Sequence, residues 1–257
     1  MSEDRLRAKC WIVTGGASGI GLATARLMAS RGARVLLWDI DAAGLEAAGR
    51  ELSAPTAVVD VTDASAVREA MASAVKALGG RLDGVLHAAG ILHTGVFEAM
   101  SDERLRKLVD VNLCGSLYVA QAAIAPLRAT RGSLVFMASA SGFAGPPEFA
   151  AYAASKAAVI SLAETLRVEL GRDGIHVAAV CPLFVDTPML SPESGNRSAK
   201  LFRSVGMVHT AEAVAQSIVR AVESRRFLVT PGIAAGHYLA TRHLPGVAAL
   251  VTRLMWR

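Results

Sequence analysis

Short apolar runs alternate along this chain with longer segments of helical periodicity, and this alternation constrains the fold more than any other feature. The apolar runs, which are rich in Val, Leu and Ile, lie at Cys10–Val13, Ala33–Trp38, Thr56–Val59, Leu82–His87, Ser133–Ala138 and His176–Val180. The helical segments lie at Gly19–Ser30, Ala42–Leu52, Ala64–Leu78, Asp102–Arg128 and Phe149–Gly171. Buried strands that alternate with helices predict an α/β fold, in which a doubly wound parallel sheet carries helices on both faces.

No linker, repeat or low-complexity tract divides the sequence, so we expect one domain over residues 1–257, with 231–257 as an apolar, amphipathic C-terminal tail. The chain has 257 residues, of which 53% are hydrophobic and 19% charged, so it can bury a sizeable core and is not globally disordered. The longest uncharged stretches, Val111–Leu127 and Gly132–Pro147, are too short and too interrupted by polar residues, Gly or Pro to predict a membrane span.

The formal net charge of +5 comes from scattered Arg and Lys residues. Without a basic run of the kind that binds nucleic acid, we expect no nucleic-acid partner. The three cysteines, Cys10, Cys114 and Cys181, have no CxxC spacing and indicate neither a disulfide framework nor a metal site. Met1–Lys9 is charged and lacks the apolar block of a signal peptide, so we expect a cytoplasmic, reduced protein.

A glycine-rich loop follows the first predicted strand and opens the first predicted helix. It reads Thr14-Gly15-Gly16-Ala17-Ser18-Gly19-Ile20-Gly21. Small residues there allow backbone N–H groups to face the pyrophosphate of a dinucleotide. A glycine triplet alone also occurs in plain turns, but the strand–loop–helix context favours cofactor binding.

Asp39 ends the second predicted strand, 18 residues after Gly21. A carboxylate at this point can accept hydrogen bonds from the adenosine ribose hydroxyls and repels a 2′-phosphate, which favours NAD over NADP. Ser18 agrees with NAD because it supplies no cation for an extra phosphate. The alternative for Asp39 is a helix N-cap or a surface charge.

Tyr152 and Lys156 stand four residues apart at the start of a predicted helix, a spacing that places both on one face. The pKa of tyrosine is ordinarily about 10, and lowering it to about 7 requires roughly 4 kcal/mol of preference for the phenolate. A fixed ammonium together with a positively charged nicotinamide could supply that preference. Taken alone, such a pair is more often an ordinary pair on a helix surface.

The order and spacing of these motifs resemble the short-chain dehydrogenase/reductase family over roughly residues 7–230, which implies a Rossmann domain. The resemblance implies the following cofactor contacts: Gly15, Ser18, Gly19, Ile20, Gly21, Asp39, the adenine-contacting pair Asp60-Val61, Gly90, Tyr152, Lys156 and, on the nicotinamide side, Val185 and Thr187. It implies four catalytic residues: Asn112, Ser139, Tyr152 and Lys156.

The implied activity is NAD-dependent interconversion of a secondary alcohol and a ketone. In oxidation, Tyr152 as phenolate would remove the hydroxyl proton while the nicotinamide accepts the hydride. Lys156 would lower the pKa of the phenol and hold the nicotinamide ribose, and Ser139 would hydrogen-bond the reacting oxygen. Asn112 would hold a water that relays the proton outward; a hydrogen bond at a helix kink is its alternative role.

Two positions depart from the family pattern. His87-Ala88-Ala89-Gly90 stands where the family has Asn-Asn-Ala-Gly, and we expect His87 to be a structural histidine with satisfied hydrogen bonds. Leu183 replaces a glycine after Pro182, which narrows the expected nicotinamide pocket and leaves the contacts of Val185 and Thr187 open.

The predicted substrate pocket is apolar, which favours an apolar alcohol or ketone. Its expected lining is Leu92, Val96, Phe97, Phe143, Pro146, Phe149, Phe184, Met189 and Leu190. His93 and Glu148 could each add a polar contact, or be solvated loop residues. The polar segment Ser191–Lys200 is expected to be a mobile lid, with an ungated surface loop as its alternative.

Apolar residues in the tail, from Val247 to Met255, follow helical spacing. They predict a helix that docks on its own domain or on a partner subunit, or else a helix at a membrane surface. By resemblance, the helices holding Asn112–Arg128 and Phe149–Leu170 would form a homodimer or homotetramer. The rival to an enzyme is a catalytically weak NAD-binding scaffold or sensor of the same fold.

Overall fold

The computed structural model describes residues 6–190, 208–232, 234–243 and 246 of the chain. A seven-stranded parallel sheet forms its centre, with the strand order β3-β2-β1-β4-β5-β6-β9. The strands are β1 (Cys10–Thr14), β2 (Arg34–Asp39), β3 (Thr56–Val58), β4 (Gly84–His87), β5 (Ser133–Met137), β6 (His176–Val180) and β9 (Leu228–Val229). The sheet contains all six predicted strands and one short edge strand, β9, that was not predicted.

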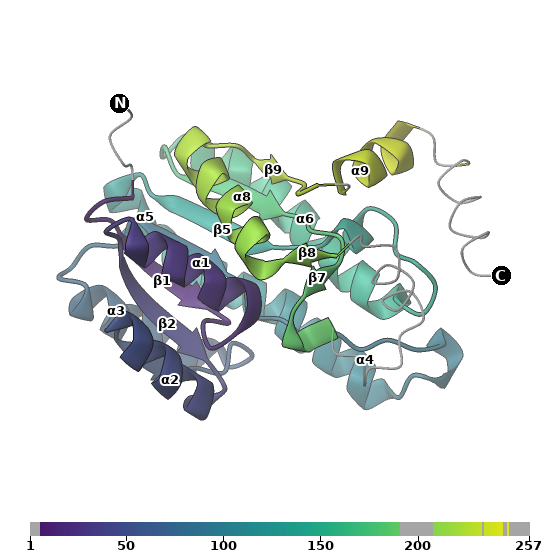
Figure 1. Cartoon of the computed structure of the whole chain (residues 1–257), viewed down its shortest axis with the longest axis horizontal. Helices are drawn as coiled ribbons and strands as arrows, with labels where there is room; N and C mark the ends of the chain where they lie inside the picture. The colour runs from purple at the N-terminus through teal and green to yellow at the C-terminus, as the bar shows by residue number, and fades with distance from the viewer. Residues whose placement is uncertain (1–5, 191–207, 233, 244–245, 247–257) are drawn as a thin grey trace.

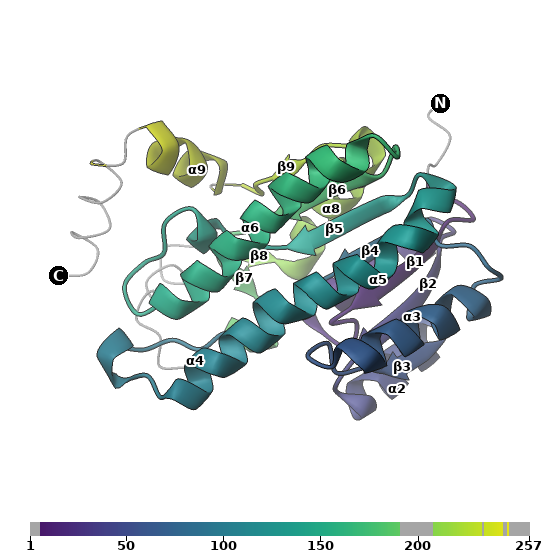
Figure 2. The same cartoon turned by 180° about the vertical axis from the view of Figure 1, so that it is seen from behind.

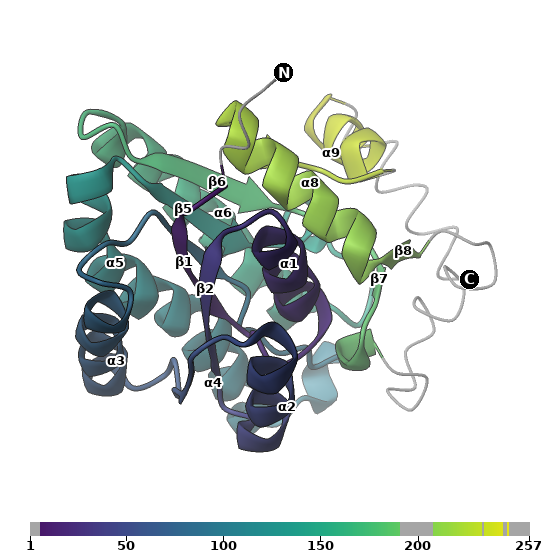
Figure 3. The same ribbon diagram turned by 60° about the vertical axis from the view of Figure 1, so that its left-hand side comes forward.

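Helices cover both faces of this sheet, as Figures 1, 2 and 3 show from three directions. One face carries α1 (Gly19–Ser30), α2 (Ala42–Leu52) and α8 (Ala211–Ser224). The other carries α3 (Ala64–Ala77), α5 (Gly115–Thr130) and α6 (Ala150–Gly171). Successive side chains of a strand point to opposite faces, so Trp11 and Val13 pack in one core cluster while Ile12 packs in the other. The predicted α/β, doubly wound fold is confirmed.

The predicted helix Asp102–Arg128 is divided into three parts. It consists of α4 (Asp102–Val109), the π-helical turn η2 (Asp110–Cys114) and α5. This whole stretch, Asp102–Thr130, is the one described helix long and apolar enough to cross a membrane by length and composition, and an 18-residue window within it has a mean hydropathy of 1.4. In this fold one side of α5 is core, because Val119, Ala123 and Leu127 are fully buried against the sheet. Only 39% of the apolar window is buried, so much of its other side remains uncovered in one chain.

Smaller elements lie near the carboxyl ends of the strands. They are the 3-10 turns η1 (Phe97–Ala99), η3 (Ala140–Gly142) and η4 (Pro188–Leu190), the two-stranded parallel sheet of β7 (Val185–Asp186) and β8 (His209–Thr210), and α9 (Ala234–His243). The predicted lid, Ser191–Lys200, and the apolar stripe from Val247 to Met255 lie outside the described residues.

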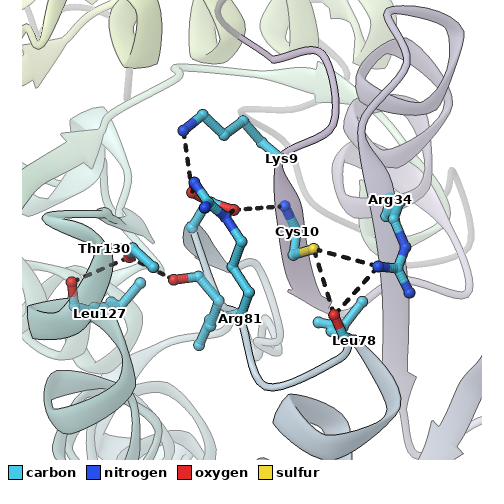
Figure 4. Close-up of polar contacts among 9 residues, drawn as sticks. Lys9, Cys10, Arg34, Leu78, Arg81, Leu127 and Thr130 are labelled. Atoms are coloured by element: carbon cyan, nitrogen blue, oxygen red, sulfur yellow. Dashed lines mark hydrogen bonds and ion pairs between the residues drawn. The ribbon is translucent and has the colours of Figure 1, made fainter.

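Buried Asp83 joins the amino ends of β1 and β4 through hydrogen bonds from Lys9, Cys10 and Arg81; these three residues are labelled in Figure 4. Its carboxylate accepts two hydrogen bonds from Arg81 (2.8 and 2.7 Å), one from Lys9 Nζ (3.2 Å) and one from the Cys10 N–H (3.0 Å). Burial alone would raise the pKa of Asp83, but the bonds from Arg81, Cys10 and Lys9 outweigh it and lower the pKa below its ordinary value. The amino ends of β1 and β4 are therefore joined by the Asp83 carboxylate, which accepts four hydrogen bonds from within the protein.

Candidate active site

The glycine loop takes the conformation that a bound diphosphate requires. Gly15 has φ +64°, and a Cβ there would lie 2.8 Å from the backbone of Ala88 and Ala89. A Cβ at Gly21 would collide with the carbonyl oxygen of Gly15. Ser18 precedes α1 and its side chain makes no capping hydrogen bond, so the N-terminal N–H groups of this helix face the loop without a side-chain partner from Ser18.

One cavity of about 380 Å³ runs from this loop along the carboxyl ends of the central strands. All thirteen predicted cofactor contacts line it: Gly15, Ser18, Gly19, Ile20, Gly21, Asp39, Asp60, Val61, Gly90, Tyr152, Lys156, Val185 and Thr187. Ser139 lines it as well. A glycine cradle at the centre, a carboxylate at one end and the catalytic side chains at the other fit an extended dinucleotide.

Three backbone hydrogen bonds hold Asp39 in the wall of the cavity, at the end where the adenosine of a dinucleotide is expected. Its Oδ1 accepts hydrogen bonds from the N–H groups of Ile40 (2.8 Å) and Asp41 (3.1 Å), and its Oδ2 accepts one from Ala17 (3.1 Å). The N-cap of α2 is Asp41, which accepts from the Gly44 N–H, so the alternative role of Asp39 as a helix cap does not apply.

Sequence reasoning missed two residues that line the same cavity, Lys107 and Val111. They are four residues apart and share one side of the α4–η2 helix. The available signal was this i, i+4 spacing just before Asn112, but nothing in the sequence shows that this side of the helix lines the cavity.

Ser139 and helix α6, which carry the predicted catalytic side chains, are brought together by a close backbone contact. Ser139 follows β5 and begins the turn η3, which packs against α6. A Cβ on Gly142 of this turn would lie 2.9 Å from the Ala157 nitrogen and from the Lys156 carbonyl carbon, so only glycine permits the approach. Tyr152 and Lys156 occupy the first two turns of α6, facing the turn that carries Ser139.

Burial dominates the acid–base properties of the two titratable groups. It raises the pKa of Tyr152 to about 12, although a hydrogen bond with the Ser139 side chain lowers it. It lowers the pKa of Lys156 to about 8. The Nζ of Lys156 lies 5.8 Å from the centre of the Tyr152 ring and donates a hydrogen bond to the Met137 carbonyl at 2.9 Å.

Burial is the largest cause of the raised pKa of Tyr152, and Lys156 is not among its causes in the chain without cofactor. The expectation that Lys156 lowers the pKa of the phenol together with a positively charged nicotinamide stays a prediction. Tyr152 is a protonated phenol at neutral pH, which is the state needed to give a proton to a ketone oxygen.

Asn112 lies in the π-helical turn and its side chain is fully buried. Its Oδ1 accepts from the Ile91 N–H (2.9 Å), and its Nδ2 donates to the Ile91 carbonyl and to Ser155 Oγ (both 3.0 Å). Asn112 does not line the cavity, but a Cβ on Gly90 would lie 3.1 Å from Asn112 Oδ1 and 3.3 Å from Lys156 Nζ. These three hydrogen bonds hold the π-helical turn, which is the alternative role expected for Asn112. Both N–H groups of its amide are used, so only the second lone pair of Oδ1 remains to bind the expected water.

The two departures from the family pattern have different consequences. His87 is 2% exposed, with Nδ1 2.9 Å from Thr14 Oγ1, which also accepts the Ala89 N–H. Burial, with a smaller effect of Lys156, lowers the pKa of His87 to about 3, so the ring is neutral. Its Nε2 has no hydrogen-bond partner among the described residues, so the expected satisfied histidine is satisfied at one nitrogen only. Leu183 lines the cavity without excluding Val185 or Thr187.

The apolar residues expected to line the substrate pocket divide into three groups. Phe149 and Phe184 are 2% and 3% exposed, and their rings pack edge-to-face on each other. The Phe149 ring also packs edge-to-face on the Tyr152 ring, so this pair lies behind Tyr152. Val96 and Phe97 are more than half exposed. Met189 lines the cavity.

The remaining substrate-side residues make local contacts. The ring of Phe143 packs against that of Tyr238. The side chains of Leu92 and Pro146 are half-buried, and that of Leu190 is not among the side chains that the structure describes. His93 and Glu148 do not line the cavity. Glu148 has φ +71° and its carbonyl accepts the Gly95 N–H at 2.9 Å.

Comparisons with known proteins identify the family of the chain. Residues 9–198 match the family model of the short chain dehydrogenases. The 3-oxoacyl-[acyl-carrier-protein] reductase FabG of Thermotoga maritima is 35% identical over 223 residues, which cover 84% of this chain and 90% of that protein. The oxidoreductase UcpA of Escherichia coli is 36% identical over 191 residues, covering 72% of each chain.

A solved structure of levodione reductase has the same fold, with a TM-score of 0.82 and 28% sequence identity, covering 90% of this chain and 99% of that one. The family match covers most of the chain, and a relative above 30% identity extends over more than two thirds of it. The chain therefore belongs to the short-chain dehydrogenase family of oxidoreductases.

Proposed function

We propose that this oxidoreductase uses NAD(H) to interconvert a secondary alcohol and a ketone on an apolar small molecule. The observation that carries the proposal is one cavity with Asp39 at one end and Ser139, Tyr152 and Lys156 at the other. A bound nicotinamide would supply or accept the hydride. The chain itself supplies the proton, the contacts to the reacting oxygen and the exclusion of water.

Proton transfer is assigned to Tyr152. In ketone reduction its phenol O–H donates to the carbonyl oxygen as negative charge develops there, and in oxidation the phenolate takes the proton back. Ser139 donates a hydrogen bond to the same oxygen. Lys156, anchored on the Met137 carbonyl, places positive charge beside the phenolate and favours its formation.

The choice of NAD over NADP rests on Asp39. Three backbone hydrogen bonds hold its carboxylate in the adenosine end of the cavity, where it can accept from ribose hydroxyls. A 2′-phosphate at this point would meet the fixed negative charge. Lys107 lines the same cavity, and its ammonium is a cation that could favour the phosphate.

The substrate class rests on the apolar side chains around Tyr152. Leu183 and Met189 line the cavity near the catalytic groups and offer no charge to a sugar phosphate. A second candidate, a 3-oxoacyl thioester, is favoured by the name of the Thermotoga maritima relative. The chemistry at the ketone would be the same in both cases.

A turnover assay at 340 nm tests the proposal. The purified chain is given NADH with apolar cyclic ketones and with a 3-oxoacyl thioester, and NADPH is used in parallel. We expect NADH oxidation with at least one ketone and its loss in Tyr152→Phe. Cofactor binding without turnover in either protein would favour the NAD-binding scaffold or sensor, and activity that survives in Tyr152→Phe would refute the mechanism.

We also propose that the enzyme is a cytoplasmic homodimer or homotetramer. In Figure 2, α5 and α6 lie side by side in front of the sheet, and no other described helix covers them. Leu117 on α5 and Val168 on α6 are exposed large apolar residues, and the Ala-rich faces permit close approach of a second copy. The three free thiols, Cys10, Cys114 and Cys181, suit a reducing compartment. Light scattering of the purified chain would test the subunit count.

A further inference from the structure

The segment between Ser139 and Tyr152 packs on α6 at Gly142 and is also joined to more distant parts of the chain at three further places. Near its start, the Ala140 N–H donates to the Pro182 carbonyl at 2.9 Å. Near its end, the Glu148 carbonyl accepts the Gly95 N–H at 2.9 Å. The middle of the segment, at Phe143 and Ala144, is held by α9.

Two consecutive residues of α9 contact two consecutive residues of this segment. His237 Nε2 lies 3.1 Å from the Ala144 carbonyl oxygen, and because a carbonyl can only accept, Nε2 must carry the proton that is donated. The ring of Tyr238 packs on that of Phe143, with centroids 4.8 Å apart and planes tilted by 59°. We call these two contacts the C-terminal clamp.

The clamp is the main attachment of α9 within the described part of the chain. Ala234 is the one described residue of the helix that is fully buried, and the helix docks on η3, the turn that begins at Ser139. Figures 1 and 2 show α9 at an outer corner of the molecule, away from the two helix layers. It does not pack on the sheet faces as α1, α2, α3, α5, α6 and α8 do, so its contacts within the described part of the chain are concentrated on the segment next to Ser139.

We propose that His237 and Tyr238 are positioning residues that fix the substrate-side wall between Ser139 and Tyr152. The inference rests on the proposed ketone reduction for its kinetic effect. The wall has little support of its own, because residues 143–148 form no helix or strand and Glu148 has a left-handed backbone conformation. The adenosine end of the cavity is built from β2 and the β3–α3 connection, which α9 does not contact closely. Loss of the clamp should therefore lower kcat/KM for the ketone and leave the affinity for the cofactor unchanged.

Matched variants separate positioning from general packing. His237→Ala removes the donor, whereas His237→Gln keeps one; Tyr238→Ala removes the ring, whereas Tyr238→Phe keeps it. We expect kcat/KM for the ketone to fall about three- to tenfold in each Ala variant, the size of one lost hydrogen bond or ring contact. The Gln and Phe variants should stay close to the parent, and the Kd for NADH should be unchanged in all four.

Hydrogen exchange gives a readout that needs no turnover. We expect faster amide exchange in the peptide spanning Ala140–Phe149 in the two Ala variants, with parental rates in the Gln and Phe variants. If the parent reduces no ketone, the proposed function fails. The hydrogen-exchange rates still test whether His237 and Tyr238 hold the Ala140–Phe149 segment in place. Unchanged exchange in the Ala variants would overturn the proposal, as would a loss of NADH affinity as large as the loss in kcat/KM.

Discussion

The two edges of the central sheet bury charged groups in opposite ways. At the amino edge, Asp83 is buried with four hydrogen bonds, and these lower its pKa despite the cost of burial. At the carboxyl edge, burial is not compensated, so the pKa of Tyr152 rises to about 12 and that of Lys156 falls to about 8. The partners of Asp83 more than offset its burial, whereas a buried titratable group without a counter-charge is typical of a functional site.

The largest effect is expected where the carboxyl edge loses its ammonium. Lys156→Met should lower ketone turnover by about 10²- to 10⁴-fold, because the phenolate loses its nearby charge. The same substitution should raise the free energy of unfolding by about 1–2 kcal/mol, because the buried charge is removed. Enzyme kinetics and urea unfolding of the same preparation check the two parts.

The burial of Lys156 also predicts how the free energy of unfolding changes with pH. The pKa of Lys156 is about 8 when folded and about 10.4 when unfolded, so the unfolded chain binds more protons between these values. The Lys156 contribution to stability should therefore rise from about pH 8 to pH 10, and this rise should be missing in Lys156→Met. The same rise in both proteins would show that Lys156 is not buried as a charge.

At the amino edge, Asp83→Asn should lower the free energy of unfolding by about 1–3 kcal/mol, because it breaks the ion pairs with Arg81 and Lys9 and weakens the bond from the Cys10 N–H. Turnover measured well below the melting temperature should not change. The lowered pKa of Asp83 means that its stabilisation is present above the unfolded value of about 3.9 and is lost as the pH falls through the folded value. Urea unfolding between pH 2 and pH 7 should therefore show a weaker acid dependence in the variant than in the parent.

The smallest effect is expected at the adenosine end of the cavity. Asp39→Ala should reduce the preference for NADH over NADPH by about tenfold, because one charge-assisted contact to ribose and one repulsion are removed together. Kd values for both cofactors, obtained by fluorescence titration, check this. Lys107→Ala is the matched variant: it should weaken NADPH binding if the ammonium reaches the 2′-phosphate, and an unaltered preference in Asp39→Ala would remove Asp39 from the specificity argument.

Elements with strong local patterns could be predicted from the sequence. The six longer strands and the main helices between them carry periodic apolar residues, and the glycine loop has a fixed place between β1 and α1. β9 could not be predicted because it has two residues and exists through pairing with β6. The amphipathic helix α8 was also missed, although it contributes Val214 and Ile218 to the core.

Site features that depend on distant contacts were beyond the sequence. The π-helical turn is stabilised by bonds from Asn112 to Ile91 and Ser155, which are 21 and 43 residues away. Apolar character alone could not show that Phe149 and Phe184 face the core behind Tyr152 rather than the cavity. The rise in the pKa of Tyr152 also depends on its degree of burial, which only the folded chain reveals.

Single-turnover oxidation of bound NADH by a ketone in Tyr152→Phe tests most directly whether the carboxyl edge is built for proton transfer. The phenylalanine ring keeps the packing against Phe149 and removes only the O–H. We predict an unchanged Kd for NADH and a hydride-transfer rate lowered by about 10²- to 10⁴-fold. A rate within a few fold of the parent would contradict the assignment of Tyr152 as the proton donor.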